Sequence, residues 1–329
     1  MKWVVVWRIT EVCDLGCPFC GYSRHLRRSR TVAEAEPVRA LGQLLGDYAW
    51  EEGREILVSW LGGEPLHWPP LLDLARVFRR DFGLHLGVTT NGTALSQAAV
   101  RRRLVEDFDE LTLSVDGPPA LHDRLRAAPG LHAQLRAGVA RLRELKERAQ
   151  RGPRLRVNMV LMHDNVRLLE EVGHTAAAWG VEELTFNALG GRDRPEFFPE
   201  HRLLPDDVAW LCQAWPGLRA RLGRLGLTVC GNDRYLERLA ASAEGRALPV
   251  EDCSPGQRFL FVDEHGLVSP CSYTGPDYGI PWHDLRAPEA IRGLPARLAE
   301  KRRGGTSAAC ADCASTQVFG KFSHQAQNG

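Results

Sequence analysis

The chain has 329 residues, an apolar fraction of 44% and a formal net charge of +1. This composition is typical of a folded enzyme with a sizeable core and excludes extensive disorder. A net charge near zero gives the protein no long-range electrostatic attraction to nucleic acid. No run of apolar residues approaches the ~18 that a membrane-spanning helix needs. Nine cysteines without a secretory signal indicate metal binding or redox chemistry, so we expect a cytoplasmic protein with no membrane or nucleic-acid partner.

Six short apolar runs predict buried strands, and the segments between them carry apolar residues at helical spacing. The predicted strands are Trp3–Ile9, Ile56–Trp60, Leu84–Thr89, Leu111–Val115, Leu155–Val160 and Leu184–Phe186. Helices are predicted at Val38–Tyr48, Leu71–Phe82, Leu131–Leu145, Val166–Trp179 and Asp206–Arg224. This alternation predicts an α/β fold of parallel βα units with right-handed crossovers, built as an open sheet or a partial barrel.

The pattern changes after residue 224. Phe259–Val262 and Leu267–Cys271 predict a hairpin around Gly266, and Glu289–Arg302 predicts one helix among loops rich in proline and glycine. Five of the nine cysteines lie here, and four of them, from Cys253 onward, are candidate metal ligands. We therefore predict two domains, a barrel over residues 1–224 and a small metal-stapled domain over residues 225–329.

The first cysteine set, Cys13, Cys17 and Cys20, follows the first predicted strand in the run Cys-Asp-Leu-Gly-Cys-Pro-Phe-Cys. Its spacing allows three thiolates to hold three irons of a [4Fe–4S] cluster and leaves one iron open. A structural zinc site is the alternative. The run resembles the signature of the radical S-adenosylmethionine (radical SAM) superfamily. That resemblance implies a partial (β/α)6 TIM-like barrel, S-adenosylmethionine (SAM) as cofactor, and hydrogen-atom abstraction by a 5′-deoxyadenosyl radical.

Further motifs follow the next predicted strands in the order found in that family, at the strand ends where barrels carry their active sites. Gly-Gly-Glu-Pro resembles the loop that binds the SAM amine, and Thr-Asn-Gly resembles the turn that closes over it. Ser-Val-Asp-Gly-Pro, followed by His-Asp-Arg-Leu-Arg, resembles an element of peptide maturases and anaerobic sulfatase-maturating enzymes. His122 and Asp123 there could equally form a helix cap. The resemblance implies these SAM contacts: Gly62, Gly63, Glu64, Thr90, Asn91, Ser114, Asp116, Arg126 and Asn158.

The second cysteine set is Cys253, Cys271, Cys310 and Cys313. Spacing alone suits zinc about as well as iron. Cys-x12-Gly-x4-Cys behind such a barrel resembles the SPASM and twitch domains, and the shorter twitch form fits because no cysteine follows Cys313. The resemblance implies a second [4Fe–4S] cluster. Four thiolates would saturate it, so it could transfer electrons but could not bind substrate.

Three further features have less specific patterns. Cys212 is predicted to be a core residue of its helix. Cys230 is either structural or a thiol that returns a hydrogen atom to the substrate, as in radical epimerases, and it is our candidate catalytic residue. The loop Asn187–Phe198 mixes charged and aromatic residues where the barrel mouth should be, so it could line a polar substrate pocket or remain a solvated surface loop.

The resemblance implies a radical SAM oxidoreductase that carries out net oxidation of a peptide, with a flavodoxin or ferredoxin as reductant. A small polar substrate, a sugar or aminocyclitol to be dehydrogenated or epimerised, is the alternative. It is favoured by our expectation that the chain begins at the first barrel strand without a peptide-recognition domain. A zinc- or RNA-binding module is the non-enzymatic alternative.

Overall fold

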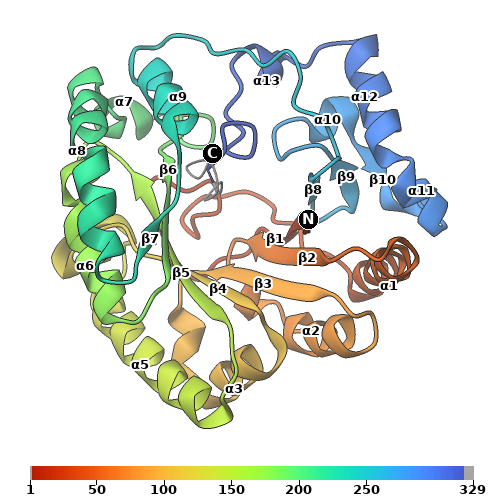
Figure 1. Ribbon diagram of the computed structural model, residues 1–329, viewed down its shortest axis with the longest axis horizontal. Coiled ribbons are helices and arrows are strands. Elements are labelled where there is room, and N and C mark those ends of the chain that lie inside the picture. The colour runs from red at the N-terminus through yellow and green to blue at the C-terminus, as the bar shows by residue number, and fades with distance from the viewer. Residues whose placement is uncertain (1, 322–329) are drawn as a thin grey trace.

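The computed structural model describes residues 2–321 as one curved, ten-stranded sheet with helices along its outer side (Figure 1). The strand order is β10-β9-β8-β1-β2-β3-β4-β5-β6-β7. Strands β1 to β7 run parallel, as does β8 beside β1, whereas β9 and β10 are antiparallel. The sheet does not close between β7 and β10. The predicted partial barrel is therefore confirmed.

All six predicted barrel strands are present, each within two residues of its expected bounds. The barrel strands are β1 (Trp3–Thr10), β2 (Ile56–Gly62), β3 (His85–Thr90), β4 (Glu110–Ser114), β5 (Arg154–Leu161) and β6 (Glu183–Ala188). The remaining strands are β7 (Thr228–Val229), β8 (Phe259–Val262), β9 (Leu267–Ser269) and β10 (Ile280–Pro281). The predicted hairpin is confirmed as β8 and β9, with β9 ending two residues early.

The helices of the barrel region include the five predicted ones. They are α1 (Ala35–Glu52), α2 (Leu71–Arg80), α3 (Ala98–Asp107), α4 (Pro119–Leu125), α5 (Leu131–Ala149), α6 (Leu169–Ala178), α7 (Phe198–His201) and α8 (Pro205–Gly223). The later helices are α9 (Asp233–Ala243), α10 (Gly275–Tyr278), α11 (Pro288–Arg292), α12 (Leu294–Gly304) and α13 (Ala308–Ala311). Short 3₁₀ helices lie at Pro65–His67, Thr93–Ser96, Val166–Leu168 and Trp282–Asp284.

Two local predictions are wrong. The single helix expected over Glu289–Arg302 is two helices, because α11 ends at Arg292, Gly293 separates it from α12, and Pro295 lies in the first turn of α12, a position that suits proline. Cys212 is exposed rather than in the core. The buried stripe of α8 includes Leu211 and Trp215, and Cys212 lies outside it.

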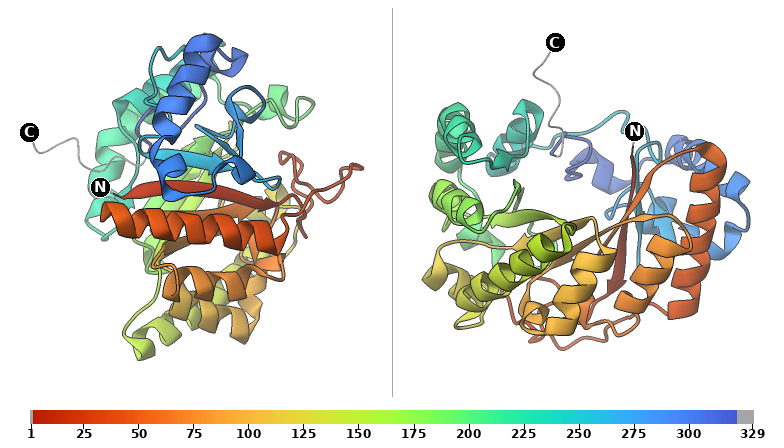
Figure 2. Two further views of the ribbon diagram at one scale, coloured as in Figure 1. Left: turned by 90° about the vertical axis from the view of Figure 1, so that its right-hand side faces the viewer. Right: turned by 60° about the horizontal axis from the view of Figure 1, so that its bottom comes forward.

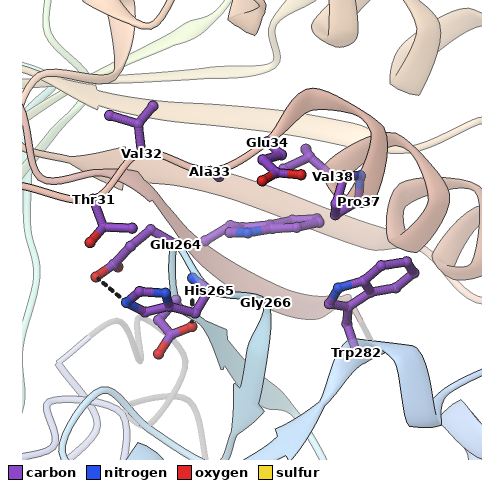
Figure 3. A pocket seen from close by; sticks show the side chains of 12 residues that line it. Thr31, Val32, Ala33, Glu34, Pro37, Val38, Glu264, His265, Gly266 and Trp282 are labelled. Carbon is purple, nitrogen blue, oxygen red and sulfur yellow. Dashed lines mark hydrogen bonds and ion pairs between the residues drawn. The ribbon is translucent and has the colours of Figure 1, made fainter.

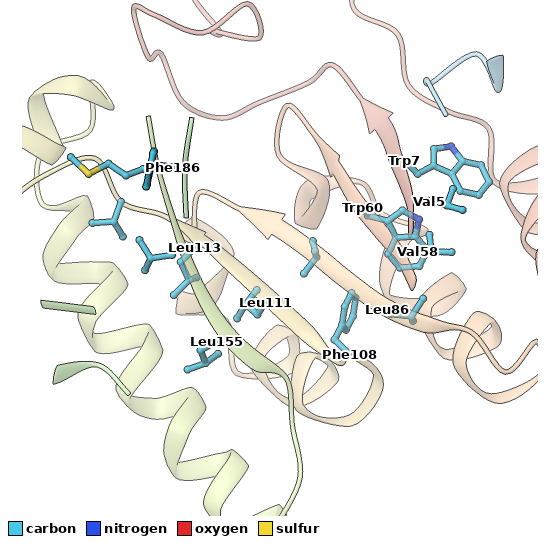
Figure 4. Close-up of a cluster of buried hydrophobic side chains, with 14 of the residues drawn as sticks. Val5, Trp7, Val58, Trp60, Leu86, Phe108, Leu111, Leu113, Leu155 and Phe186 are labelled. Carbon is cyan, nitrogen blue, oxygen red and sulfur yellow. The ribbon is translucent and has the colours of Figure 1, made fainter. Parts of the chain in front are cut away.

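Side chains alternate along the strands, and on β4, β5 and β6 this gives an apolar outer face and a largely polar inner face. On β5, Leu155, Val157 and Met159 are buried, whereas Arg156 and Asn158 on the other face are half-buried. The apolar side chains form the core between the sheet and the helices, as Figure 4 shows for Leu111, Leu113 and Leu155. Figure 2 shows α1, α2, α3 and α5 following the outer side. The polar residues therefore line the inside of the barrel.

The region after residue 224 extends the barrel sheet at both edges. Strand β7 pairs with β6, and β8 pairs with β1 over Val4–Trp7. The predicted division at residue 224 into a barrel and a twitch-like domain stays a prediction. In residues 2–321 the structure contains no helix that is both long and apolar enough to span a membrane.

Candidate active site

The first cysteine set lies on the loop that follows β1, and two neighbouring loops are fastened to it. Gly63 N donates to Thr10 O at 2.7 Å, and Glu64 N donates to Val12 O at 2.8 Å. A Cβ on Gly62 would lie 2.4 Å from Thr10 O, and one on Gly63 would lie 2.1 Å from Val12 O. These glycines therefore allow the loop after β2 to approach the backbone of the cysteine loop.

Glu64 joins the loops after β2 and β3. Its carboxylate is fully buried and accepts hydrogen bonds from Leu66 N at 3.1 Å, Thr90 Oγ1 at 2.8 Å and Asn91 N at 2.7 Å. Burial raises the pKa of Glu64 to about 7, although these bonds oppose the rise. Within the described residues, the Glu64 carboxylate binds groups of its own loop and of the loop after β3, so its contact with SAM stays a prediction.

Asn91 completes the link to the cysteine loop. Its Nδ2 donates to Asp14 Oδ1 at 2.8 Å and lies 3.9 Å from Cys13 Sγ. Its Oδ1 accepts from Thr93 N at 2.9 Å. The loops after β1, β2 and β3 thus form one hydrogen-bonded unit around the first cysteine set. The sequence motifs did not reveal the part played by Asp14.

Asp116 and Arg126 support the cysteine loop from the other side. Arg126 Nε donates to Asp116 Oδ2 at 2.6 Å, and Asp116 Oδ1 accepts from Val160 N at 2.9 Å. Burial opposes the charge of Arg126, but the Asp116 carboxylate raises the pKa of the guanidinium. Cys17 Sγ lies 3.7 Å from Arg126 O, and the guanidinium lies over the Phe19 ring at 5.4 Å. Both residues are therefore already engaged within the protein.

The structure gives His122 and Asp123 separate structural roles. His122 lies within α4 and accepts a hydrogen bond at Nδ1 from Asp116 N at 3.1 Å, so it does not cap the helix. Burial, with a smaller effect from the nearby Arg126 guanidinium, lowers the pKa of His122 to about 4. Asp123 accepts from Gly130 N at 2.6 Å and His132 N at 2.8 Å at the start of α5.

The thiols of the first cysteine set lie close enough together to raise the pKa of their neighbours. Burial raises the pKa of Cys13 to about 12 and that of Cys17 to about 11, with neighbouring thiols adding to the increase. A thiol-only donor set on one loop suits iron–sulfur ligation. In residues 2–321, no three His, Cys, Asp or Glu side chains converge as ligands of a single metal ion. Cluster ligation by Cys13, Cys17 and Cys20 stays a prediction.

The fold also brings the second cysteine set together from three segments. The pKa of Cys313 is raised by burial and then by Cys271, Cys310 and Cys253, so all four thiols are neighbours. Arg302 Nη1 donates to Cys253 Sγ at 3.0 Å, and Cys271 Sγ lies 3.3 Å from Thr274 Oγ1. Four neighbouring thiols are the donor type that iron–sulfur clusters use, and ligation of a cluster by this set stays a prediction.

The polar inner face holds the remaining predicted residues. Ser114 is the last residue of β4 and pairs in register with Asn158, which lies in the carboxyl-terminal half of β5. Asn158 Oδ1 accepts from Thr185 Oγ1 at 2.9 Å and from Lys321 Nζ at 3.0 Å. Cys230 is 1% exposed and lies 3.9 Å from Glu183 Oε2. Sequence reasoning missed Lys321, because nothing in its local sequence distinguishes it from a surface lysine.

The loop expected over Asn187–Phe198 lies between the two cysteine sets. Arg192 stacks over the Tyr273 ring at 4.6 Å, next to the second set in sequence. Phe197 contacts Phe19 of the first cysteine loop, with ring centroids 6.3 Å apart, and stacks on His201 at 3.8 Å. The loop is therefore anchored at both ends, and its role in substrate binding stays a prediction.

A hollow of about 290 Å³ lies outside this site (Figure 3). It is lined by the segment before α1, including Val32 and Glu34, and by Glu264, His265 and Trp282 from the opposite side. No predicted site residue lines it. The hollow is thus separate from the two cysteine sets.

Comparisons with known proteins agree with this arrangement. The family model described as the Radical SAM superfamily matches residues 7–178, just over half of the chain. The AdoMet-dependent heme synthase of Methanosarcina barkeri is 26% identical over 82% of this chain and 76% of its own. The PqqA peptide cyclase of Xanthomonas axonopodis pv. citri is 25% identical over 86% of this chain and 71% of its own.

Solved structures share the fold at lower identity. Streptococcus suis SuiB bound to the precursor peptide SuiA has a TM-score of 0.67 at 14% identity, covering 98% of this chain and 72% of its own. Native anSMEcpe with bound AdoMet has a TM-score of 0.65 at 15% identity, covering 99% of this chain and 92% of its own. The likeness therefore extends through the region that carries the second cysteine set.

Proposed function

Because the chain belongs to the radical SAM superfamily, we propose that it cleaves SAM reductively at a [4Fe–4S] cluster on Cys13, Cys17 and Cys20 and carries out net oxidation of a peptide. The observation that supports this most directly is the joining of the cysteine loop to the loops after β2 and β3 through Glu64 and Asn91. When bound, the cluster and SAM supply a radical that removes a hydrogen atom from substrate.

The chain's own residues would hold the cofactor at the carboxyl ends of the strands. Gly62 and Gly63 present backbone groups there, and Ser114 offers a hydroxyl that suits the SAM ribose. Glu64, Thr90 and Asn91 keep the loops in register. Asp116 and Arg126 are paired with each other, so their part is to position the cysteine loop unless SAM displaces that ion pair. Asn158 is the remaining SAM contact that we propose.

Net oxidation needs an acceptor for the second electron, and the second cysteine set supplies a place for one. Four thiolates saturate a cubane, so a [4Fe–4S] cluster there would transfer electrons without binding substrate. The twitch-like form, with one auxiliary cluster, is the form we propose. A flavodoxin or ferredoxin would deliver the electron that cleaves SAM, and the reducing cytoplasm is the expected location.

Peptide is the substrate class that we favour. The names of one relative and one structural neighbour, PqqA peptide cyclase and SuiB bound to SuiA, state that those proteins act on or bind peptides. A small polar substrate, such as a sugar or aminocyclitol, is the second candidate, because the barrel interior is lined by Asn158, Thr185 and Asn187.

SAM cleavage by anaerobically reconstituted protein tests the assignment. We expect 5′-deoxyadenosine to form with a strong reductant and to be lost when Cys13, Cys17 and Cys20 are all replaced by Ala. Cys212→Ala is the matched control, because this exposed thiol lies on the outside of α8. Robust cleavage by the triple variant would refute the proposal.

The product formed from a peptide encoded beside the gene tests the reaction type. Oxidation gives a product lighter by two hydrogens, and Cys230→Ala retains activity. Epimerisation instead gives an isomer that carries deuterium from heavy water and depends on Cys230. Burial raises the pKa of Cys230 to about 12, so it is a thiol with a hydrogen atom to give, and the deuterium measurement separates the two reactions.

A further inference from the structure

A lysine from the end of the described chain lies inside the barrel, beside a predicted SAM contact. Lys321 is 3% exposed. Its Nζ donates to Asn158 Oδ1 at 3.0 Å and also to Asn187 Oδ1. Both asparagines belong to the inner face. Asn187 lies at the carboxyl end of β6, and Asn158 lies in the carboxyl-terminal half of β5, on the side where a parallel barrel carries its chemistry. An amine held by amide oxygens at this position can donate hydrogen bonds or accept a proton.

The segment after the second cysteine set places this lysine. Ser315 and Phe319 are buried, and Lys321 N donates to Thr316 O at 3.0 Å, which turns the chain inward. Figure 1 shows the end of the coloured chain in the space enclosed by the curved sheet. Lys321 is thus delivered to the barrel interior by the same segment that carries Cys313.

The charged and titratable groups near Lys321 in the described residues include Arg156, Glu183 and Cys230. Arg156 on β5 faces it and pairs with Glu183 on β6 at 2.8 Å. Cys230, after β7, lies on the same side and 3.9 Å from Glu183. Burial and, to a smaller extent, Arg156 lower the pKa of Lys321 to about 7, and Cys230 opposes the change. About half of the amine is therefore neutral at pH 7 and most of it above that pH, as a proton acceptor must be.

We propose that Lys321 is the base of the reaction chamber, which takes a proton from the substrate after a hydrogen atom has been removed from an adjacent carbon. This inference rests on the proposed oxidation. The substrate loses one hydrogen atom to the adenosyl group, one proton to Lys321 and one electron to an oxidised iron–sulfur cluster on the second cysteine set. The adjacent C–N, C–O or C–S bond gains double-bond character, and Lys321 becomes an ammonium that later releases its proton to solvent.

The proton affinity of Lys321 can be measured without a substrate, because the chain has only four lysines, Lys2, Lys146, Lys301 and Lys321. Cluster-loaded, oxidised protein with ¹³Cε-labelled lysine gives one NMR signal for each. The Lys321→Arg variant identifies the signal of Lys321. We expect that signal to titrate near pH 7. A Lys321 signal that titrates near pH 10, the ordinary value for a lysine side chain, would overturn the proposal.

Activity then separates a base from a structural tether. For a peptide that the wild-type protein oxidises, Lys321→Met should lower product per 5′-deoxyadenosine by about 100-fold. Lys321→Arg should not restore it, although Arg can still donate hydrogen bonds to the two asparagines. The acidic limb of the product pH profile should disappear as well. Lys301→Met on α12 is the control. Near-wild-type coupling in Lys321→Arg would refute the role, whereas failure of the wild type to cleave SAM would refute the proposed function itself.

Discussion

Replacing Glu64 with Gln should reduce the pH dependence of protein stability, because Glu64 is a buried carboxyl whose pKa is raised from its ordinary 4.5 to about 7 by burial. The folded protein binds this proton more tightly than the unfolded chain does. Its contribution to stability is therefore fully present below pH 4.5 and is lost as the pH rises through 7.

The size of the effect follows from the interval between the two pKa values. That interval corresponds to about 3 kcal/mol of unfolding free energy, of which about 2 kcal/mol falls between pH 5 and pH 7.5. The Gln side chain does not titrate, but its Nε2 would face Asn91 N, a donor against a donor. Such a mismatch costs about 1–3 kcal/mol. The variant should thus be clearly less stable than wild type at pH 5, with a difference that shrinks by about 2 kcal/mol at pH 7.5.

Urea unfolding followed by tryptophan fluorescence, under reducing anaerobic conditions, measures this difference at several pH values. Subtracting the unfolding free energy of the variant from that of wild type at each pH cancels the contributions of the titrating groups that the two proteins share. Glu144→Gln, an exposed change on α5, is the control and should leave the pH dependence as it is. Parallel stability curves for wild type and Glu64→Gln between pH 5 and pH 7.5 would show that the burial argument is wrong.

Three other changes test the rest of the site. Iron and sulfide analysis should approach about eight of each per chain and fall to about four when the second cysteine set is changed to Ala; stoichiometric zinc would contradict this. Gly63→Ala should disrupt the cysteine loop and lower SAM cleavage more than tenfold, because its Cβ would lie 2.1 Å from Val12 O; Gly190→Ala, where the space is open, is the control. His122→Asn keeps an acceptor for Asp116 N but does not titrate. Because the pKa of His122 is lowered from 6.5 to about 4, wild type should lose stability relative to this variant as pH falls from 6.5 to 4 in urea titrations.

The sequence was sufficient for the strands because each is a short apolar run whose burial depends on its own residues. It missed β7 and the pairing of β8 with β1, since the partners of these strands, β6 and β1, lie far away in the chain. Helices α3, α4 and α9 were also missed. In α3, the charged Arg101 occupies a buried position, where its guanidinium donates to Leu95 O and Ser96 O. A charged residue at a buried position interrupts the apolar spacing by which a helix is predicted.

The motifs predicted which residues gather near the first cysteine set, but not what each one contacts. The motif order placed Gly62, Glu64 and Asn91 on adjacent loops, because the carboxyl ends of parallel strands meet at one edge. The partners of the Glu64 carboxylate depend on distances of a few tenths of an ångström, which spacing does not encode. Lys321 lay beyond any motif, since only the path of the segment after Cys313 brings it to Asn158.

Glu64 and Lys321 carry opposite charges in solution, yet the same burial drives both toward neutrality, to pKa values of about 7. The consequences differ because their hydrogen-bond partners differ. Glu64 accepts three donors, so it holds loops whether or not it carries a proton. Lys321 instead donates to the amide oxygens of Asn158 and Asn187 on the inner face of the barrel. The hydrogen bonds that Glu64 accepts therefore give it a positioning role, whereas burial of an amine on the inner face supports the base role that we propose for Lys321.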